Sequence, residues 1–132
     1  MSFSFDSYLG VHETALHVRS RRAQILASNI ANVNTPNFKA RDIDFTDALR
    51  NSAAGHSAKN MTATHSMHIQ AKSLMSESEL KYRNPYQDSL DGNTVEHQVE
   101  MAAYSDNAMR YLANLRILTG KFNTLRTAIK GQ

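Results

Sequence analysis

The C-terminal stretch 101-MAAYSDNAMRYLANLRILTGKFNTLRTAIK-130 decides the fold of this chain. Its apolar residues follow alternating steps of three and four, which is the a/d spacing of a coiled-coil interface. A helix over about 94–130 is also far longer than the average helix of a globular protein. Length and spacing together favour a bundle or coiled coil over an ordinary core helix. The apolar seam consists of Met101, Tyr104, Ala108, Tyr111, Leu115, Leu118, Phe122, Leu125 and Ile129.

A second long helix is predicted over about 6–33, and it is apolar on two sides. Each side carries a stripe that repeats every seven residues, and the two stripes lie on roughly opposite faces. One partner helix cannot bury both, so this helix needs several neighbours. The pattern favours other chains as those neighbours; the alternative is that the middle of this chain folds over the second stripe. The first stripe is Leu9, Leu16, Ala23 and Ile30, with Leu26 and Val33 beside it, and the second is Val11, Val18 and Ile25.

The residues between the helices are rich in Ser, Thr, Asn and His. Short extended pieces are predicted around Lys39–Phe45 and Met67–Ala71, a helical turn around Thr46–Asn51, and a loop over 53–60. We therefore expect a mainly α protein, in which two long terminal helices pair as an antiparallel coiled coil beside a small irregular or β segment. The expected segments are 1–34, 35–93 and 94–132.

Local signals predict where the first helix ends. Pro36 disfavours the α conformation at Thr35, so the helix has to stop before it. Asn29, Asn32 and Asn34 can bond the backbone groups left open at this end, and asparagine tolerates the left-handed conformation common there.

The start of the C-terminal helix has its own signals. Asp91-Gly92 predicts a turn, after which Asn93 can cap the helix, with Glu96 three residues later as in a capping box. Gly131 is the expected stop.

Composition excludes several classes of function. The chain has 132 residues, a formal charge of +3 and no cysteine, which rules out a disulfide framework and a thiol nucleophile. The positive charge is spread thinly, and we interpret the cluster Arg19, Arg21 and Arg22 as a solvated helix face, so no nucleic-acid partner is expected. Neither a cleavable secretory signal nor an apolar run long enough to span a membrane is visible.

Candidate chemistry is sparse. His56, His65 and His68 lack the spacing of a metal site and are interpreted as surface histidines. Asp42 and Asp44 would share one face of an extended segment, where we interpret them as solvated charges. No phosphate-binding loop or nucleophile motif occurs. The sequence therefore predicts no enzyme, cofactor, metal or small-molecule substrate.

The stretch 27-ASNIANVNTPNFKARDIDF-45 resembles the N-terminal signature of bacterial flagellar axial proteins. In that family a helix ends in Asn-Ile-Ala-Asn, followed by Thr-Pro and an aromatic–basic pair. The continuation from Lys39 and the stretch 89-SLDGNTVE-96 resemble the proximal rod members in particular. The resemblance covers essentially the whole chain and is weakest over 52–79. The motif residues are Asn29, Asn32, Asn34, Thr35, Pro36 and Phe38.

The resemblance implies a structural subunit of the flagellar basal-body rod, whose terminal helices form an inner coiled-coil layer and whose middle segment lies outside it. It implies that the rod crosses the periplasm and transmits torque for motility. The implied partners are other copies of the chain, the rod proteins FlgC and FlgF, the basal adaptor FliE and the flagellar type III export apparatus. Export would need no cleaved signal. The alternative is a helical adaptor in the rod or needle base of a related secretion system.

Two sets of residues follow as expectations. Phe45 and Leu49 resemble an export-gate recognition pattern, although a core-facing pair explains them equally well. Phe38 would anchor the departing strand on the helices. The residues expected to hold the inner layer are Leu9, Leu16, Leu26, Ile30, Tyr111, Leu115, Leu118, Phe122, Leu125 and Ile129.

Overall fold

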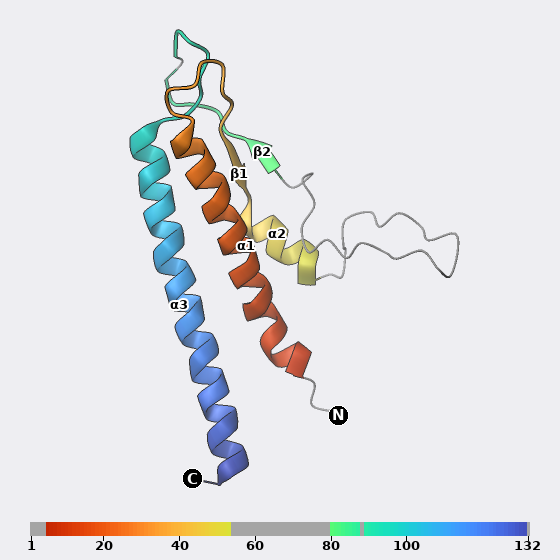
Figure 1. The fold of residues 1–132 in the computed structure, drawn as a ribbon. Coiled ribbons are helices and arrows are strands. Elements are labelled where there is room, and N and C mark those ends of the chain that lie inside the picture. Colours follow the sequence, from red (N-terminus) through yellow and green to blue (C-terminus); the bar gives the residue numbers. More distant parts are fainter. Residues whose placement is uncertain (1–4, 54–79, 88, 132) are drawn as a thin grey trace, which may run out of the picture.

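A computed structural model describes residues 5–53, 80–87 and 89–131. Two long helices, α1 (Phe5–Ala31) and α3 (His97–Lys130), lie side by side and run in opposite directions (Figure 1). Between them in sequence come strand β1 (Arg41–Ile43), helix α2 (Phe45–Ala53) and strand β2 (Leu80–Tyr82). The predicted fold class, two paired terminal helices with a small β-containing middle segment, is confirmed.

The middle segment agrees with the sequence where it is described. Strand β1 lies inside the predicted extended piece, and α2 contains the predicted helical turn. The other extended piece, Met67–Ala71, and residues 54–60 of the predicted loop lie outside the described residues.

A two-stranded antiparallel sheet and a capped helix organise this segment. Strand β1 pairs with β2 in a register that sets Asp42 opposite Lys81, and the Arg83 amide continues the ladder by donating to the Ala40 carbonyl at 3.0 Å. Helix α2 begins after Asp44, whose Oδ1 accepts from the amides of Thr46 at 3.0 Å and Asp47 at 3.2 Å. This is the N-cap geometry favoured for aspartate. The Asp47 amide, together with Lys81, lowers the pKa of Asp44.

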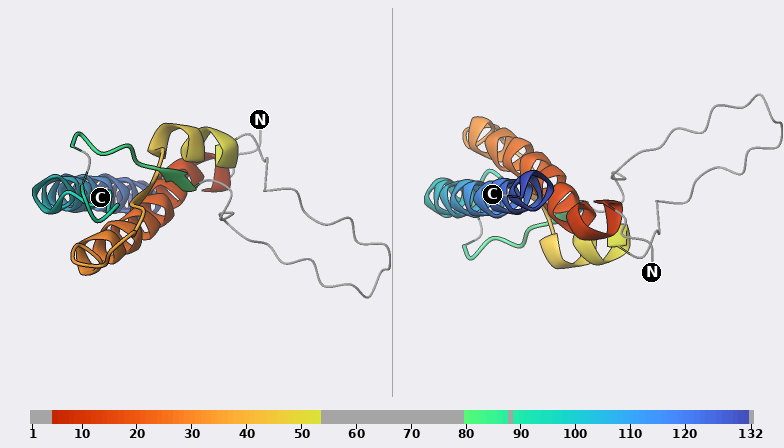
Figure 2. Two further views of the ribbon diagram at one scale, coloured as in Figure 1. Left: turned by 90° about the horizontal axis from the view of Figure 1, so that it is seen from above. Right: turned by 90° about the horizontal axis from the view of Figure 1, so that it is seen from below.

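The apolar core lies between α1 and the middle segment. Val18, Ile43 and Ala48 are buried together, and Ile25, Phe45 and Leu80 pack against them. Figure 1 shows α1 between α3 and α2, and both views in Figure 2 show α2 beside the N-terminal part of α1.

This core decides between the two alternatives for the second stripe of α1. The middle segment of the same chain covers Val18 and Ile25, so the favoured expectation that other chains cover them is wrong. Only Val11 of that stripe is exposed. The stripe was misassigned because the apolar residues that cover it, Ile43 and Leu80, come from two short strands without strong periodicity.

The start of α3 also differs from expectation. Glu96 occupies the N-cap position and makes no capping bond; its Oε1 instead accepts from the amides of Tyr86 at 2.7 Å and Gln87 at 3.1 Å. The predicted capping box at Asn93 and Glu96 is therefore wrong. At the other end the prediction is confirmed: Gly131 is left-handed (φ 72°), and its amide bonds the Thr127 carbonyl.

Candidate assembly interface

The turn after α1 keeps part of its predicted chemistry. The Asn32 Nδ2 donates to the Ser28 carbonyl at 2.8 Å, and the Thr35 hydroxyl donates to the Asn32 Oδ1 at 3.1 Å. These bonds close the helix end. The left-handed residue, however, is Asn37 (φ 60°) and none of the three predicted asparagines. Its amide donates to the Asp91 carbonyl at 2.9 Å, so the turn also reaches the segment before α3.

Asn93 joins the end of α1 to the start of α3. It is buried, and its Nδ2 donates to the carbonyls of Asn32 at 3.2 Å and Val33 at 2.7 Å. Nearby, the Thr94 hydroxyl accepts from the Ala40 amide at 2.8 Å. Because the side-chain amide of asparagine carries two donor hydrogens, Asn93 alone can hold the segment before α3 against both carbonyls at the end of α1.

Asn29 has a different role from the predicted helix stop. It is buried, its Nδ2 donates to the Arg41 carbonyl at 2.7 Å, and its Oδ1 accepts from the Arg41 amide at 3.2 Å. The same Nδ2 lies 3.2 Å from Oε2 of Glu100 on α3. Asn29 thus connects α1 to β1 and to α3, while Asn34 is exposed in the turn.

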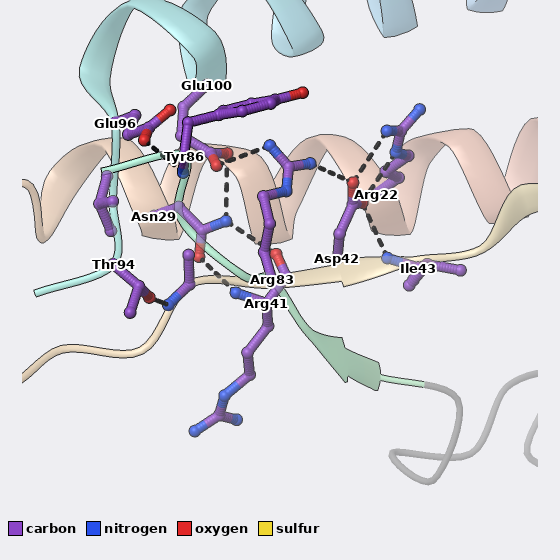
Figure 3. A network of polar contacts seen from close by, with 12 residues as sticks. Arg22, Asn29, Arg41, Asp42, Ile43, Arg83, Tyr86, Thr94, Glu96 and Glu100 are labelled. Carbon is purple, nitrogen blue, oxygen red and sulfur yellow. Dashed lines mark hydrogen bonds and ion pairs between the residues drawn. The ribbon is translucent and has the colours of Figure 1, made fainter. Parts of the chain in front are cut away.

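A buried ionic network continues from this point (Figure 3). Arg22 pairs with both carboxylate oxygens of Asp42, at 2.8 and 2.9 Å. Arg83 bridges the same carboxylate to Glu100, which it meets at 2.8 Å. Glu100 is fully buried. Two positive and two negative side chains from α1, β1, the end of β2 and α3 therefore balance one another, three of them half-buried around the buried Glu100.

The network overturns two sequence interpretations. Asp42 is only 18% exposed and Arg22 only 19%, so neither is a solvated charge. Burial by itself would raise the pKa of Asp42, but the bonds and charge of Arg22, with the Ile43 amide and Arg83, hold that pKa below its ordinary value. The bond to Asp42 in turn raises the pKa of Arg22.

Arg19 is likewise not a plain solvated residue. Its guanidinium lies 4.0 Å from the centre of the Phe45 ring, the geometry of a cation–π contact. Burial, and next the charge of Arg110, lower its pKa. Of the cluster, only Arg21 stays on the exposed surface, where it bonds Gln24.

Of the remaining motif residues, Pro36 is exposed in the turn and Phe38 lies beside the core. Phe38 is half-buried and lines a groove of about 290 Å³ together with Ile25 and Leu80. Phe45 and Leu49, the resemblance-based export pattern, are half-buried on α2. The contacts of Phe45 with the core fit the core-facing explanation.

The predicted seam of α3 mostly does not face α1. Leu115 is 41% exposed, Phe122 52% and Ile129 80%, and Met101 and Tyr104 are exposed as well. The side of α3 that contacts α1 instead carries polar residues such as Asn107 and Asn114. The predicted inner-layer residues Leu9, Leu16, Ile30, Tyr111, Leu118 and Leu125 are half-buried, and Leu26 is buried.

Helical geometry places these apolar residues on one side of the hairpin. On α1, Leu9 follows Tyr8, whose carbonyl accepts a bond from Lys121 of α3, and Leu16 follows the buried Ala15. On α3, Leu115 and Phe122 each follow a position that bonds α1. Because the helices are antiparallel and both right-handed, a step of one residue rotates both stripes toward the same flank. We call this flank the apolar face: Leu9, Leu16, Ile30, Leu115, Leu118, Phe122, Leu125 and Ile129.

Residues 5–53, 80–87 and 89–131 contain no group of three His, Asp or Glu side chains that could hold a metal ion. His12 bonds Asn114 across the helix pair, and His56, His65 and His68 lie outside the described residues. Within the same described ranges, no helix is both long and apolar enough to cross a membrane.

An elongated helical hairpin with an exposed apolar face defines the class of helical assembly subunits. Residues 9–39 match the family model described as flagella basal body rod protein. The chain is 42% identical to the flagellar basal body rod protein FlgB of Aeromonas hydrophila, covering 100% of this chain and 99% of that one. It is 43% identical to FlgB of Cereibacter sphaeroides (strain ATCC 17029 / ATH 2.4.9), with 97% and 98% covered, and 38% identical to FlgB of Escherichia coli K12, with 95% and 94% covered.

Relatives of this identity over nearly full length show that the chain belongs to the FlgB family of flagellar basal body rod proteins. It is a structural component of the rod. A subunit of a related secretion system is not favoured, because the relatives and the family model are all named for the flagellar rod.

Proposed function

We propose that the apolar face of the hairpin packs against other copies of the chain and against neighbouring rod proteins. The observation that carries the proposal is the exposure of Leu115, Phe122 and Ile129, since large apolar side chains gathered on one face mark an interaction site. In this arrangement α1 and α3, within segments 1–34 and 94–132, form an inner layer. The middle segment, 35–93, lies on the outside.

The same proposal assigns the chain to the proximal rod. Its partners there are FlgC, FlgF and FliE, and the assembled rod crosses the periplasm and transmits torque to drive motility. Support comes from the relatives named FlgB and from the family resemblance of the motif around Asn29–Phe38. Contacts of this kind that do not close on themselves generate a helical tube.

Export through the type III apparatus, without a cleaved signal, completes the proposal. Phe45 packs against the core in the folded chain, so the apparatus would recognise Phe45 and Leu49 only in an unfolded chain. A chain without cysteine forms no disulfide that would have to be opened first.

The test is charge on the apolar face. Leu115→Asp and Phe122→Asp should abolish swimming and basal-body formation when each variant replaces the wild-type chain in a deletion strain. Both side chains are exposed, so circular dichroism of the purified variants should show unchanged helix content. Asn123→Asp, an exposed charge on another side of the same helix, is the matched control and should swim. Normal swimming of the two Leu and Phe variants would overturn the proposal.

A further inference from the structure

Four polar side chains on α3 recur every seven residues, and each bonds α1. Glu100 accepts from Asn29 at 3.2 Å, and the Nδ2 of Asn107 donates to the Arg19 carbonyl at 2.9 Å. Further along, Asn114 donates to the His12 carbonyl at 3.0 Å, and the Nζ of Lys121 donates to the Tyr8 carbonyl at 3.4 Å. We call Glu100, Asn107, Asn114 and Lys121 the polar ladder.

The polar ladder occupies the place where a coiled coil usually has apolar residues. Glu100 and Asn107 are buried, while Asn114 and Lys121 are half-buried. The Oδ1 of Asn107 is buried without a hydrogen-bond partner among the described residues. Such a group costs stability, so apolar residues here would hold the two helices together more strongly. The ladder therefore has to be explained by something other than stability.

Register is the property that polar seam residues control. Apolar contact has no direction, so an apolar seam tolerates a slip, whereas a buried asparagine in a coiled coil selects one register and one partner. The four rungs also differ in side chain and in partner, so a shifted register does not restore their contacts. A slip by one heptad would move each rung by about 10 Å along α1 and separate Glu100 from Asn29 and Arg83.

The Asn114 rung makes two contacts with the same residue of α1, His12. The Oδ1 of Asn114 lies 2.9 Å from Nδ1 of His12, in addition to the bond to the His12 carbonyl. This pair fits only when the two side chains are opposite each other. The contacts of Glu100 and Asn114 therefore form together in only one register of the two helices.

We propose that the polar ladder is a specificity device: it makes α3 pair with α1 of its own chain, antiparallel and in one register, and rejects a helix of a second copy at this position. The apolar face then stays free for contacts between subunits. The statement on register stands by itself, and the statement on the free apolar face rests on the proposed function.

The test replaces the two central rungs, Asn107→Leu with Asn114→Leu, in the full chain. Asn123→Leu adds leucine at an exposed position of the same helix and is the matched control. Because the chain has no cysteine, spin labels can be attached at cysteines introduced at Ser20 and Ala113, which are exposed on α1 and α3. Pulsed electron resonance gives the distance between the helices, and sedimentation velocity gives the oligomeric state.

The wild-type chain and Asn123→Leu should show one narrow distance and the same sedimentation coefficient. The double variant should show a second distance, because a slip of one heptad displaces one label along the helix axis by about 10 Å, or a dimer at concentrations where the wild type has none. A double variant identical to the wild type in both measurements would overturn the proposal. If it does not fold, Asn114→Leu alone, at a half-buried rung, is judged by the same two readouts. The swimming assay of Leu115→Asp tests the proposed function separately.

Discussion

At the junction end of the hairpin, where α1 stops and α3 begins, the chain buries Leu26, Asn29 and Glu100 and closes an ionic network around them. At the terminal end, formed by α1 residues 8–16 and α3 residues 111–130, the helices meet through Asn114 and Lys121, and large apolar side chains remain exposed. Figure 1 shows that β1 and β2 lie along α1 well away from the C-terminal part of α3.

The difference teaches that one chain completes only one end of its own structure. The junction end has buried apolar residues, satisfied polar groups and two chain segments tied by Asn93. Among the described residues, the terminal end buries fewer large side chains than the junction end. Under the proposed function, neighbouring subunits cover the apolar side chains that stay exposed there. A structure built this way is expected to be unevenly stable before assembly.

The largest expected effect comes from breaking the buried network. Glu100→Ala should reduce the free energy of unfolding by about 4 kcal/mol, because it removes one of the two carboxylates that balance Arg22 and Arg83 and leaves the network with a net positive charge. Asp106→Ala removes the exposed ion pair of the same helix with Arg110 and should cost less than about 1 kcal/mol. Urea unfolding followed by circular dichroism measures both. Equal losses for the two variants would contradict the contrast.

Shortening one leucine at each end sharpens the comparison. Leu26→Ala should cost about 3 kcal/mol, because the side chain is fully buried at the junction end and its removal leaves a cavity. Leu115→Ala should change the stability of the isolated chain by no more than about 0.5 kcal/mol, since that side chain is exposed. The same urea experiment applies, and a large loss for Leu115→Ala would show that the terminal end is packed after all.

Two glycines should respond in opposite directions. Gly92 has a φ of 71°, and a Cβ there would lie 2.7 Å from Oδ1 of Asn37, so Gly92→Ala should cost about 1–2 kcal/mol. Gly120 lies inside α3 with open space around it, and Gly120→Ala should add about 0.5–1 kcal/mol. Thermal unfolding resolves the sign of both changes. Stabilisation by Gly92→Ala would contradict the tight turn.

The smallest effect is a dependence on pH. The pKa of Asp42 is lowered in the folded chain, so its contribution to stability is complete above about pH 4 and is lost as the pH falls through that lowered value. Asp42→Asn should therefore lose less stability than the wild type between about pH 4 and pH 2. Asp106→Asn removes an exposed carboxylate of α3 and is the matched control. Urea unfolding of each protein at several pH values in this range measures the effect. If Asp42→Asn lost as much stability as the wild type, the lowered pKa of Asp42 would not be what makes stability depend on pH.

Much of the fold was predictable because it depends on local periodicity and local stops. The seven-residue spacing of Leu9, Leu16, Ala23 and Ile30 and the seam from Met101 to Ile129 identified both helices, and Pro36 and Gly131 identified where they stop. The motif around Asn29 identified the family. Each of these signals lies within a few turns of one helix, so the sequence alone displays it.

The polar interior was not predictable, because its partners are distant in sequence. Arg83 and Glu100 meet across 17 residues, and Asn29 and Glu100 across 71. As single letters they are indistinguishable from solvated charges, which is how Asp42 and Arg22 were misinterpreted. One signal was present: Glu100, Asn107, Asn114 and Lys121 repeat every seven residues, and a polar heptad beside an apolar one indicates which side of α3 faces α1.

Hydrogen exchange along α3 in the isolated full chain tests the central claim most directly. If the junction end is complete and the terminal end awaits its neighbours, amides of residues 101–107 should exchange at least about tenfold more slowly than those of residues 115–126. Equal protection along the whole of α3 would contradict the claim, because it would show that a single chain stabilises both ends of its hairpin.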